Sequence, residues 1–193
     1  MISAIILAAG ESKRMGQPKM LLRWGKLTVI EHVITTFLDA SIEDIVVVTG
    51  GAREQVEKVI GQYPVRSIHN DDYETAEMLS SLQCGLRAMP NQAQATLIGL
   101  GDQPQIQEGS VRLIGEAYDE GKSRLIVPSF QMRRGHPWLV ARPLWNELLE
   151  MKPPQSPRDF LNKHADEIHY VDVDTSSILA DLDTPEDYQK SHP

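Results

Sequence analysis

The sequence predicts an α/β fold, in which a mostly parallel sheet is flanked by helices and carries a small antiparallel excursion. Short apolar runs alternate with amphipathic stretches along most of the chain, as strands and covering helices do. After Pro128 this alternation stops, and two strand-like runs, 130–134 and 138–141, flank a glycine turn. No linker, repeat or low-complexity tract interrupts the 193 residues, so we expect one domain spanning 1–193.

The expected strands are short runs of apolar residues. In chain order they cover residues 3–7, 45–48, 65–68, 96–100, 125–127, 130–134, 138–141 and 168–173. Gly50-Gly51 ends the second strand and Gly101-Asp102 ends the fourth, and such residues mark turns. Loops at these strand ends are therefore expected.

The expected helices follow from apolar residues at helical spacing and from capping signals. They begin near Thr28 and cover, after that first one, residues 56–60, 78–89, 110–118, 144–151, 158–164 and a terminal segment from Thr184. Thr28 and Glu31 have the spacing of a capping box. Thr184 is followed by a proline at the first helical position and by Asp187 three residues later, so a helix should begin there.

Composition excludes several classes of function. A formal net charge of −8 argues against general nucleic-acid binding, which depends on neutralising phosphates. No apolar run approaches the roughly 20 residues that cross a bilayer, and Ile5–Ala9 is too short for a signal-peptide core. The single cysteine, Cys84, excludes an intrachain disulfide and fits a reducing compartment. We therefore expect a cytoplasmic protein without a nucleic-acid or membrane partner.

The loop Leu7–Lys19 follows the first strand and is rich in small and basic residues. Small residues at positions 8 to 10 let a ligand approach the backbone, where successive N–H groups form an anion-binding concavity. Lys13, Arg14 and Lys19 add positive charge that suits a triphosphate. The glycine spacing is one residue too long for a P-loop, and no dinucleotide fingerprint is present. From the residues alone, a polar surface loop remains an alternative.

This loop resembles the L-A-A-G-x-S-x-R-M-G-x-P-K signature of the nucleotidyltransferases related to the molybdopterin-guanine dinucleotide synthases, and the resemblance extends to Tyr188. It implies a Rossmann-like sheet of the nucleotide-diphospho-sugar transferase type. The site residues that it implies for nucleotide binding here are Leu7, Ala8, Ala9 and Gly10, with Arg14 and Lys19 acting on the phosphates during catalysis. The guanylyl branch usually has L-A-G-G, so Ala9 favours CTP over GTP.

Two aspartates are candidate metal ligands. Asp102 follows a strand at the edge where α/β folds place ligands, and Mg²⁺ prefers few carboxylates combined with phosphate oxygens. Taken alone, Asp102 is equally consistent with a turn that caps the next helix. The resemblance makes Asp102 a catalytic, nucleotide-binding and Mg²⁺-binding residue, with Mn²⁺ as a substitute metal. It assigns Asp183, in the D-x-D-T-P-E-D segment 181–187, to the same metal, and Asp181 is the weaker candidate.

Arg134, Gly135, His136 and Pro137 form an element that resembles the R-G-H-P sequence of the cytidylyl branch, which is assigned to the phosphate acceptor. Arginines and a histidine donor around a glycine turn suit a dianionic phosphate, and a basic hairpin tip is the alternative. A phosphate is already ionised and needs no general base.

The segment 70–86 resembles a family segment that has an asparagine and paired serines, which implies nucleotide-binding roles for Asn70 and Ser81. Glu77 stands where the family usually has glycine, and this departure leaves the consequence for the pocket open.

The resemblance implies that the phosphate of a molybdopterin-type acceptor attacks the α-phosphorus of CTP, with release of pyrophosphate. Such chemistry needs alignment and charge neutralisation more than covalent catalysis. Three alternatives remain at this stage: a guanylyltransferase for the same acceptor, a cytidylyl or uridylyl transferase acting on a sugar or polyol phosphate, and a non-catalytic nucleotide-binding chaperone for the cofactor. A molybdoenzyme that receives the product is a further expected partner.

Overall fold

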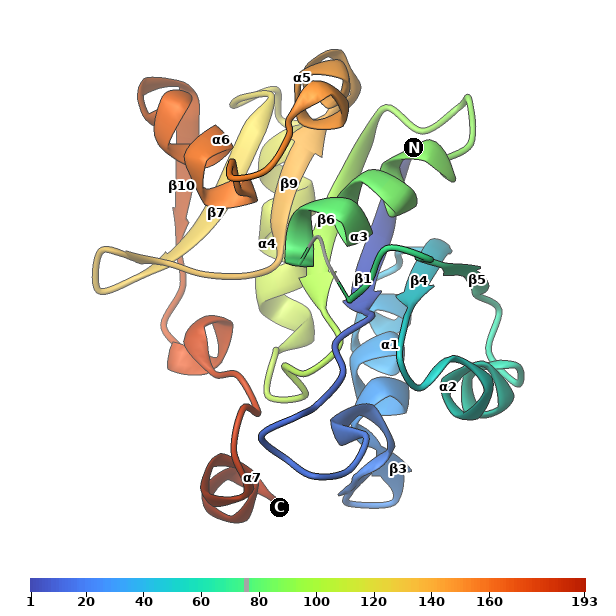
Figure 1. Ribbon diagram of the computed structural model, residues 1–193. Helices are drawn as coiled ribbons and strands as arrows, with labels where there is room; N and C mark the ends of the chain where they lie inside the picture. The colour runs from blue at the N-terminus through green and yellow to red at the C-terminus, as the bar shows by residue number, and fades with distance from the viewer. Residues whose placement is uncertain (75–76) are drawn as a thin grey trace.

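The chain forms a twisted, mostly parallel sheet covered by helices on both faces, which confirms the predicted fold class (Figure 1). The computed structural model describes residues 1–74 and 77–193, apart from the side chain of Glu77. The strands of the main sheet lie in the order β10-β7-β9-β6-β1-β4-β5, with β8 paired to β7. They are β1 (Ile2–Ala8), β4 (Asp44–Thr49), β5 (Arg66–His69), β6 (Ala95–Leu100), β7 (Leu125–Phe130), β8 (Arg133–Arg134), β9 (Trp138–Ala141) and β10 (Ile168–Asp172).

Each face of the sheet has its own apolar core. The helices are α1 (Val29–Asp39), α2 (Arg53–Ile60), α3 (Glu77–Arg87), α4 (Glu108–Asp119), α5 (Trp145–Glu150), α6 (Pro157–Lys163) and α7 (Pro185–Ser191). Along β1, Ala4 and Ile6 pack with buried residues of α1, α2 and α4, whereas Ile5 and Leu7 pack with those of α3, α5 and α6. Alternate side chains of a strand point to opposite faces, so the near-continuous apolar run of β1 marks a strand buried on both faces.

The capping signals in the sequence correspond to helix starts. Thr28 and Glu31 form a complete capping box at α1, and Thr184 and Asp187 form one at α7. In each box the hydroxyl accepts a backbone N–H and the carboxylate accepts the N–H of the cap residue, which satisfies donors that the first helical turn leaves unpaired. The local prediction is confirmed at both helices.

The antiparallel excursion is present, but the bounds and pairing of its strands differ from the two runs, 130–134 and 138–141, that the sequence indicated. Residue 130 belongs to β7, and β8 pairs back onto β7 rather than onto β9. Strand β9 instead enters the main sheet, where it runs antiparallel to both β6 and β7. The glycine turn therefore connects β8, which pairs with β7, to β9, which lies between β7 and β6 in the same sheet. All four side chains of β9 are buried there.

Several short elements were not predicted. Strands β2 (Arg23–Trp24) and β3 (Leu27–Thr28) form a separate antiparallel pair. Single-turn 3₁₀ helices occur at η1 (Lys19–Leu21), η2 (Arg142–Leu144), η3 (Ala165–Glu167) and η4 (Ser176–Leu179). In the described part of the chain, no helix combines the length and the apolar character needed to cross a membrane.

A buried histidine joins α5, α6 and η3. His164 is 8% exposed, its Nδ1 lies 2.8 Å from a carboxylate oxygen of Glu167, and its Nε2 lies 3.0 Å from one of Glu147. Burial alone would lower the pKa of His164, but the hydrogen bonds and charges of the two glutamates outweigh it and raise the pKa above the ordinary 6.5. Lys163 pairs with Glu147, and Arg124 pairs with Glu167.

This cluster predicts a pH-dependent contribution to stability. Because the folded pKa of His164 is raised, its contribution is complete below pH 6.5 and is lost as the pH rises through the folded pKa. His164→Gln should therefore lower the free energy of unfolding by about 0.5–1 kcal/mol more at pH 6 than at pH 8.5. This is the magnitude of partly exposed ion pairs, and it applies because Glu147 and Glu167 are partly exposed. Urea unfolding at both pH values measures the difference.

Lys163→Gln provides the matched control. It removes a partner of Glu147 whose charge does not change between pH 6 and 8.5, so its effect on stability should be equal at the two pH values. A His164→Gln effect that is also equal at both would rule out the proposed charge state.

Candidate active site

The first two predicted site segments lie side by side because β1 and β6 are parallel neighbours. Leu7 pairs with Leu100 at the carboxyl ends of these strands, and the Gly101 N–H donates to the carbonyl of Leu7 at 2.9 Å. A Cβ on Gly101 would lie 3.1 Å from that carbonyl oxygen, so glycine permits this close approach. Asp102 therefore follows directly beside the loop that leaves β1.

The loop after β1 folds back so that Lys19 returns to the strand ends. Ser12 and Gly16 adopt positive φ values of 55° and 65°, and the Ser12 hydroxyl accepts the Lys19 N–H at 3.0 Å. Met15 and Met20 are 7% and 3% exposed and anchor the loop to the molecule. The polar surface loop considered from the sequence is thus an anchored turn with its lysine buried.

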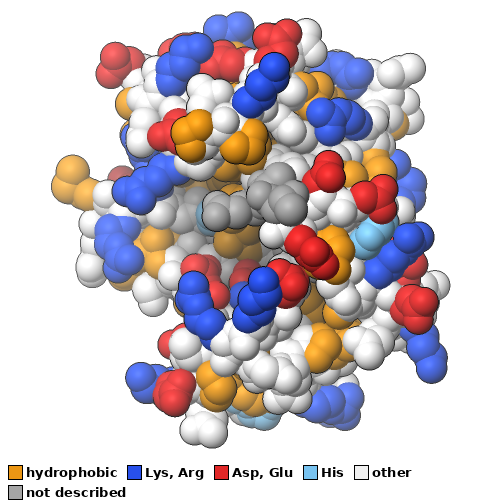
Figure 2. Space-filling view, viewed as in Figure 1, with side chains coloured by type: hydrophobic (Ala, Val, Ile, Leu, Met, Phe, Trp, Pro, Cys, Tyr) orange, Lys and Arg blue, Asp and Glu red, His pale blue; other side chains and the backbone are white. Residues whose placement is uncertain are grey.

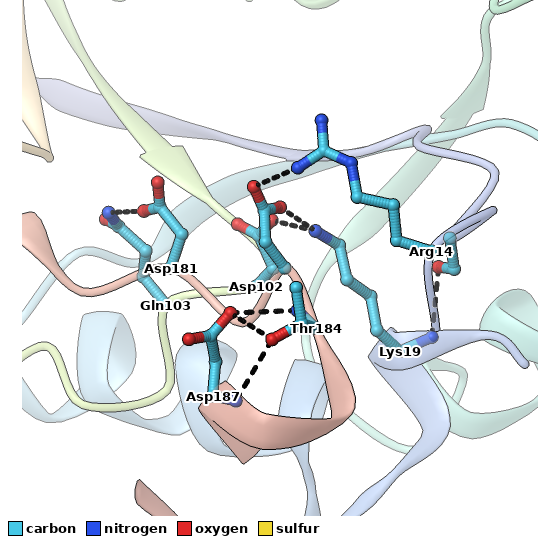
Figure 3. Close-up of polar contacts among 9 residues, drawn as sticks. Arg14, Lys19, Asp102, Gln103, Asp181, Thr184 and Asp187 are labelled. Atoms are coloured by element: carbon cyan, nitrogen blue, oxygen red, sulfur yellow. Dashed lines mark hydrogen bonds and ion pairs between the residues drawn. The ribbon is translucent and has the colours of Figure 1, made fainter. Parts of the chain in front are cut away.

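Lys19 is the central cation of the site. Its ammonium contacts a carboxylate oxygen of Asp102 and lies 3.3 Å from one of Asp183, residues 83 and 164 positions away (Figure 3). Arg14 donates to the other oxygen of Asp183 at 2.9 Å. The structure therefore brings together four residues that the sequence placed in three separate motifs.

The charge of Lys19 is preserved despite its burial. The lysine is 9% exposed, and burial alone would lower its pKa, but the charge and hydrogen bond of Asp102, followed by those of Asp183, raise the pKa above 10.5. Lys19 is consequently an ammonium at neutral pH, and it offsets two carboxylates that would otherwise repel each other.

The segment that carries Asp183 is fixed by two residues that the sequence reasoning did not single out. Gln103 is 3% exposed and its amide donates to Asp181, while the Leu182 N–H donates to the Asp102 carbonyl at 3.1 Å. Leu182 is fully buried beside Trp24. In the sequence, only its position next to Asp102 could have pointed to a role for Gln103, because its partner Asp181 lies 78 residues away.

Two adjoining cavities surround these charges. One of about 340 Å³ and one of about 280 Å³ share Gly10, Lys19 and Asp183 in their walls. The first is otherwise lined by Leu7, Ala9, Met20, Tyr73, Met78, Ser81, Leu100, Asp102 and Asp181, and the second by Glu11, Ser12, Lys13 and Arg14. Figure 2 shows a hollow near the middle of this face with acidic and basic side chains along its lower rim. A mixed apolar and charged cavity is therefore joined to a basic one.

A larger hollow of about 630 Å³ lies at the opposite edge, beside the amino ends of β1 and β4. Its charged side chains are Arg112 and four carboxylates, those of Glu43, Asp44, Glu116 and Asp119. Such a surface would repel a polyphosphate, so size alone does not make it the nucleotide site.

The carboxylates suit a magnesium ion that is completed by substrate. Within residues 1–74 and 77–193, no group of three or more histidine, cysteine, aspartate or glutamate side chains is placed to hold a metal. Asp102 and Asp183 nevertheless both approach one cation, the Lys19 ammonium, so their oxygens can face a shared positive centre. Mg²⁺ takes one or two carboxylates and fills its other positions with water and phosphate oxygens, and this donor set fits that preference.

Asn70 and Ser81 adjoin the first cavity in different ways. Ser81 lines its wall, whereas Asn70 is 4% exposed and is not among the described lining residues. The Asn70 amide donates to the hydroxyl of Ser81 at 3.0 Å and to that of Ser80 at 2.8 Å. The side chain of Glu77, whose effect on the pocket was left open, lies outside the described residues.

The turn predicted to bind the acceptor follows the same edge of the sheet. Trp138 pairs with Ile98, so residues 135–137 lie at the carboxyl end of β6, the strand that Asp102 follows in the chain. Arg134 points toward β10 and α6, where it donates to Tyr170 at 2.7 Å and Asn162 at 2.9 Å. The structure thus places the turn near the site but engages its arginine elsewhere.

His136 in this turn is an uncharged side chain at neutral pH. It is half-buried, and loss of solvation lowers its pKa to about 4. A Cβ on the preceding Gly135 would lie 2.3 Å from the carbonyl oxygen of Ile178 in η4, which also accepts the His136 N–H at 3.0 Å. In the ligand-free protein, His136 is therefore a neutral hydrogen-bonding group.

Solved structures, among them a nucleotidyltransferase, share this fold. A nucleotidyl transferase from Methanothermobacter thermautotroptrophicus matches with a TM-score of 0.84 and 24% identity over 100% of this chain and 96% of that chain. Rv0371c from Mycobacterium tuberculosis H37Rv matches with a TM-score of 0.85 and 24% identity over 98% and 96%. A manganese complex of Rv0371c matches with a TM-score of 0.84.

Sequence comparison gives the family. The model of the MobA-like NTP transferase domain matches residues 4–168, and the chain belongs to this family. It is 30% identical to the molybdenum cofactor cytidylyltransferase of Escherichia coli (strain K12), over 97% of this chain and 93% of that protein. It is 33% identical to the bifunctional protein GlmU of Syntrophomonas wolfei over 68% of this chain, which is 29% of that longer protein. The chain is thus a nucleotidyltransferase, as the sequence motifs predicted.

Proposed function

We propose that this protein transfers CMP from CTP to the phosphate of molybdenum-bearing molybdopterin and releases pyrophosphate. The observation that carries the chemistry is the Lys19 ammonium between Asp102 and Asp183, beside the basic cavity that contains Arg14. The acceptor and the nucleotide are suggested by the full-length similarity to the E. coli enzyme and by the L-A-A-G sequence of the loop.

Charge neutralisation and alignment are the main tasks of the chain in this reaction. Lys19 and Arg14 would bind the triphosphate and stabilise the charge that develops on the departing pyrophosphate. The acceptor phosphate attacks the α-phosphorus as an anion, so no side chain has to remove a proton. Loss of solvation lowers the pKa of His136 at the acceptor turn to about 4, so this side chain would be a weak base, which agrees with this requirement.

Asp102 and Asp183 would hold Mg²⁺, with Mn²⁺ as a substitute. When bound, the metal supplies Lewis-acid polarisation of the phosphate oxygens and additional positive charge. The metal and the Lys19 ammonium would compete for the same two carboxylates. With the metal bound there, Lys19 would contact phosphate oxygens instead. The manganese complex of Rv0371c concerns a protein with the same fold.

The remaining site residues would surround the nucleoside and the acceptor. Leu7, Ala9 and Gly10 line the 340 Å³ cavity next to Ala8, and Ser81 lies in its wall. These uncharged lining residues would contact the base and ribose, because the phosphates and the metal would occupy the charged ones. The acceptor would approach along residues 134–137, and a molybdoenzyme would receive the product.

Ala9 predicts a preference for CTP over GTP. It is 6% exposed, and the backbone at this position cannot retreat, because a Cβ on Gly50 would already lie 2.2 Å from the Ala9 carbonyl oxygen. A purine would have to displace this loop. Ala9→Gly should narrow the CTP preference by about tenfold, the value of one methyl group in a tight pocket. The ratio of kcat/KM for CTP and GTP, measured with one acceptor, checks this, and a wild-type preference for GTP would contradict it.

A turnover assay tests the proposed function. Pyrophosphate release is measured with molybdenum-loaded molybdopterin and each of the four NTPs, and we expect release with CTP. Release only with GTP would assign a guanylyltransferase. Release only when a sugar or polyol phosphate replaces molybdopterin would assign another acceptor class, and CTP binding without release from any acceptor would indicate a nucleotide-binding chaperone.

A further inference from the structure

Asn70 is a buried connector between the end of β5 and helix α3. Its backbone N–H donates to the Thr49 carbonyl at 3.0 Å, which fixes the residue at the edge of the sheet. Its side-chain oxygen accepts the Asp72 N–H at 3.1 Å, and its side-chain nitrogen lies 2.8 Å and 3.0 Å from the hydroxyl oxygens of Ser80 and Ser81. Three polar groups therefore surround one amide that is 4% exposed.

The orientation of this amide follows from its partners. A backbone N–H can only donate, so the group that faces Asp72 must be the amide oxygen. The two amide hydrogens are then directed at the two serine oxygens, which act as acceptors toward Asn70. The Ser81 hydroxyl proton cannot point back at Asn70 and has to point elsewhere.

Ser81 of helix α3 borders the 340 Å³ cavity. Among the other lining residues, Leu7, Ala9 and Leu100 belong to or pack against the apolar core that includes buried residues of α3, whereas Lys19 and three aspartates are the charged ones. Among residues 1–74 and 77–193, no group accepts the Ser81 hydroxyl proton, and the side chain is 5% exposed. A hydroxyl so placed presents a hydrogen-bond donor to the cavity and leaves it unsatisfied unless a ligand accepts it.

We infer that Asn70 is a specificity-determining positioning residue, which fixes the Ser81 hydroxyl as a donor and so selects a base with an acceptor at its ring nitrogen. The inference rests on the proposed function, because it places the base against the uncharged lining residues of the cavity. Cytosine presents a lone pair at N3, whereas uracil carries a hydrogen there and would face the Ser81 proton with its own. Ala9 would select the base by its size, whereas Asn70 and Ser81 would select it by its hydrogen-bonding pattern.

Direct binding of CTP and UTP tests this polarity. Dissociation constants are measured by calorimetry with Mg²⁺ and without acceptor, and the wild type should prefer CTP about tenfold to a hundredfold. Asn70→Asp replaces two donors by an acceptor of the same shape, so the Ser81 proton turns toward position 70 and Ser81 offers a lone pair to the cavity. The CTP preference should then disappear or reverse in favour of UTP.

Asn91→Asp is the matched control, since it makes the same chemical change in an exposed turn before the amino end of β6, at the other edge of the sheet. Its CTP to UTP ratio should equal that of the wild type. A folded Asn70→Asp variant with an unchanged ratio would overturn the inference, as would a wild type that binds both nucleotides equally.

Ser81→Ala keeps the test decisive if Asn70→Asp does not fold. Removal of the donor should bring the CTP to UTP ratio close to one without reversing it, and an unchanged ratio would overturn the inference. The binding measurement contains no acceptor, so it is independent of the turnover assay. A protein that binds CTP more tightly than UTP but releases no pyrophosphate in the turnover assay would disprove only the proposed transfer. A protein that performs the transfer but does not discriminate would disprove only the role of Asn70.

Discussion

Asp102→Ala should reduce turnover by at least about a thousandfold while leaving the protein folded. Asp102 would supply one of the two carboxylates for the metal and holds the Lys19 ammonium in place. The cost to stability should be small, because Asp183 still pairs with Lys19 in the variant and one of two neighbouring negative charges is removed. Pyrophosphate release measures the rate, and the binding of Mn²⁺ followed by electron paramagnetic resonance measures the metal site independently.

Asp183→Ala should behave similarly, with a smaller loss, since its side chain is 49% exposed against 17% for Asp102. Asp119→Ala removes an exposed aspartate at the end of α4 and should change neither quantity. Near wild-type turnover with Mg²⁺ in either active-site variant would remove that aspartate from the proposed metal site.

Lys19→Met should lower kcat/KM for CTP by about a hundredfold to a thousandfold, the usual effect of losing one group that stabilises transition-state charge. The variant leaves Asp102 and Asp183 facing each other without the cation that separates them. Mg²⁺ should therefore raise the melting temperature of Lys19→Met more than that of the wild type, because the metal replaces the lost positive charge. Turnover kinetics and thermal unfolding at several Mg²⁺ concentrations provide the two measurements.

Lys26→Met removes an equal charge from the exposed turn between β2 and β3 and serves as the control. It should retain wild-type kinetics and an unchanged response to Mg²⁺. If Lys19→Met bound CTP and turned over normally, the role of Lys19 in the phosphate site would be refuted.

Helix starts were predictable because their determinants are local. The Thr28 and Thr184 boxes each need only four consecutive residues, and both form as the spacing indicated. The strands β1, β4 and β6 were predictable because burial on both faces requires a continuous apolar run. The pairing of β9 was not, since it depends on neighbours β6 and β7 rather than on the turn next to it in the chain.

The sequence by itself determined the α/β class, the nucleotidyltransferase motifs and the identity of the charged residues, because each of these is written in composition, period or short spacing. Only the tertiary structure decided that Lys19 lies between Asp102 and Asp183, that Gln103 holds the segment of Asp181, and that Asn70 turns its amide nitrogen to the serines. These contacts join residues 10 to 164 positions apart. The parallel sheet brings the loops at its carboxyl edge together, and burial then leaves each polar group only the partners that the fold supplies.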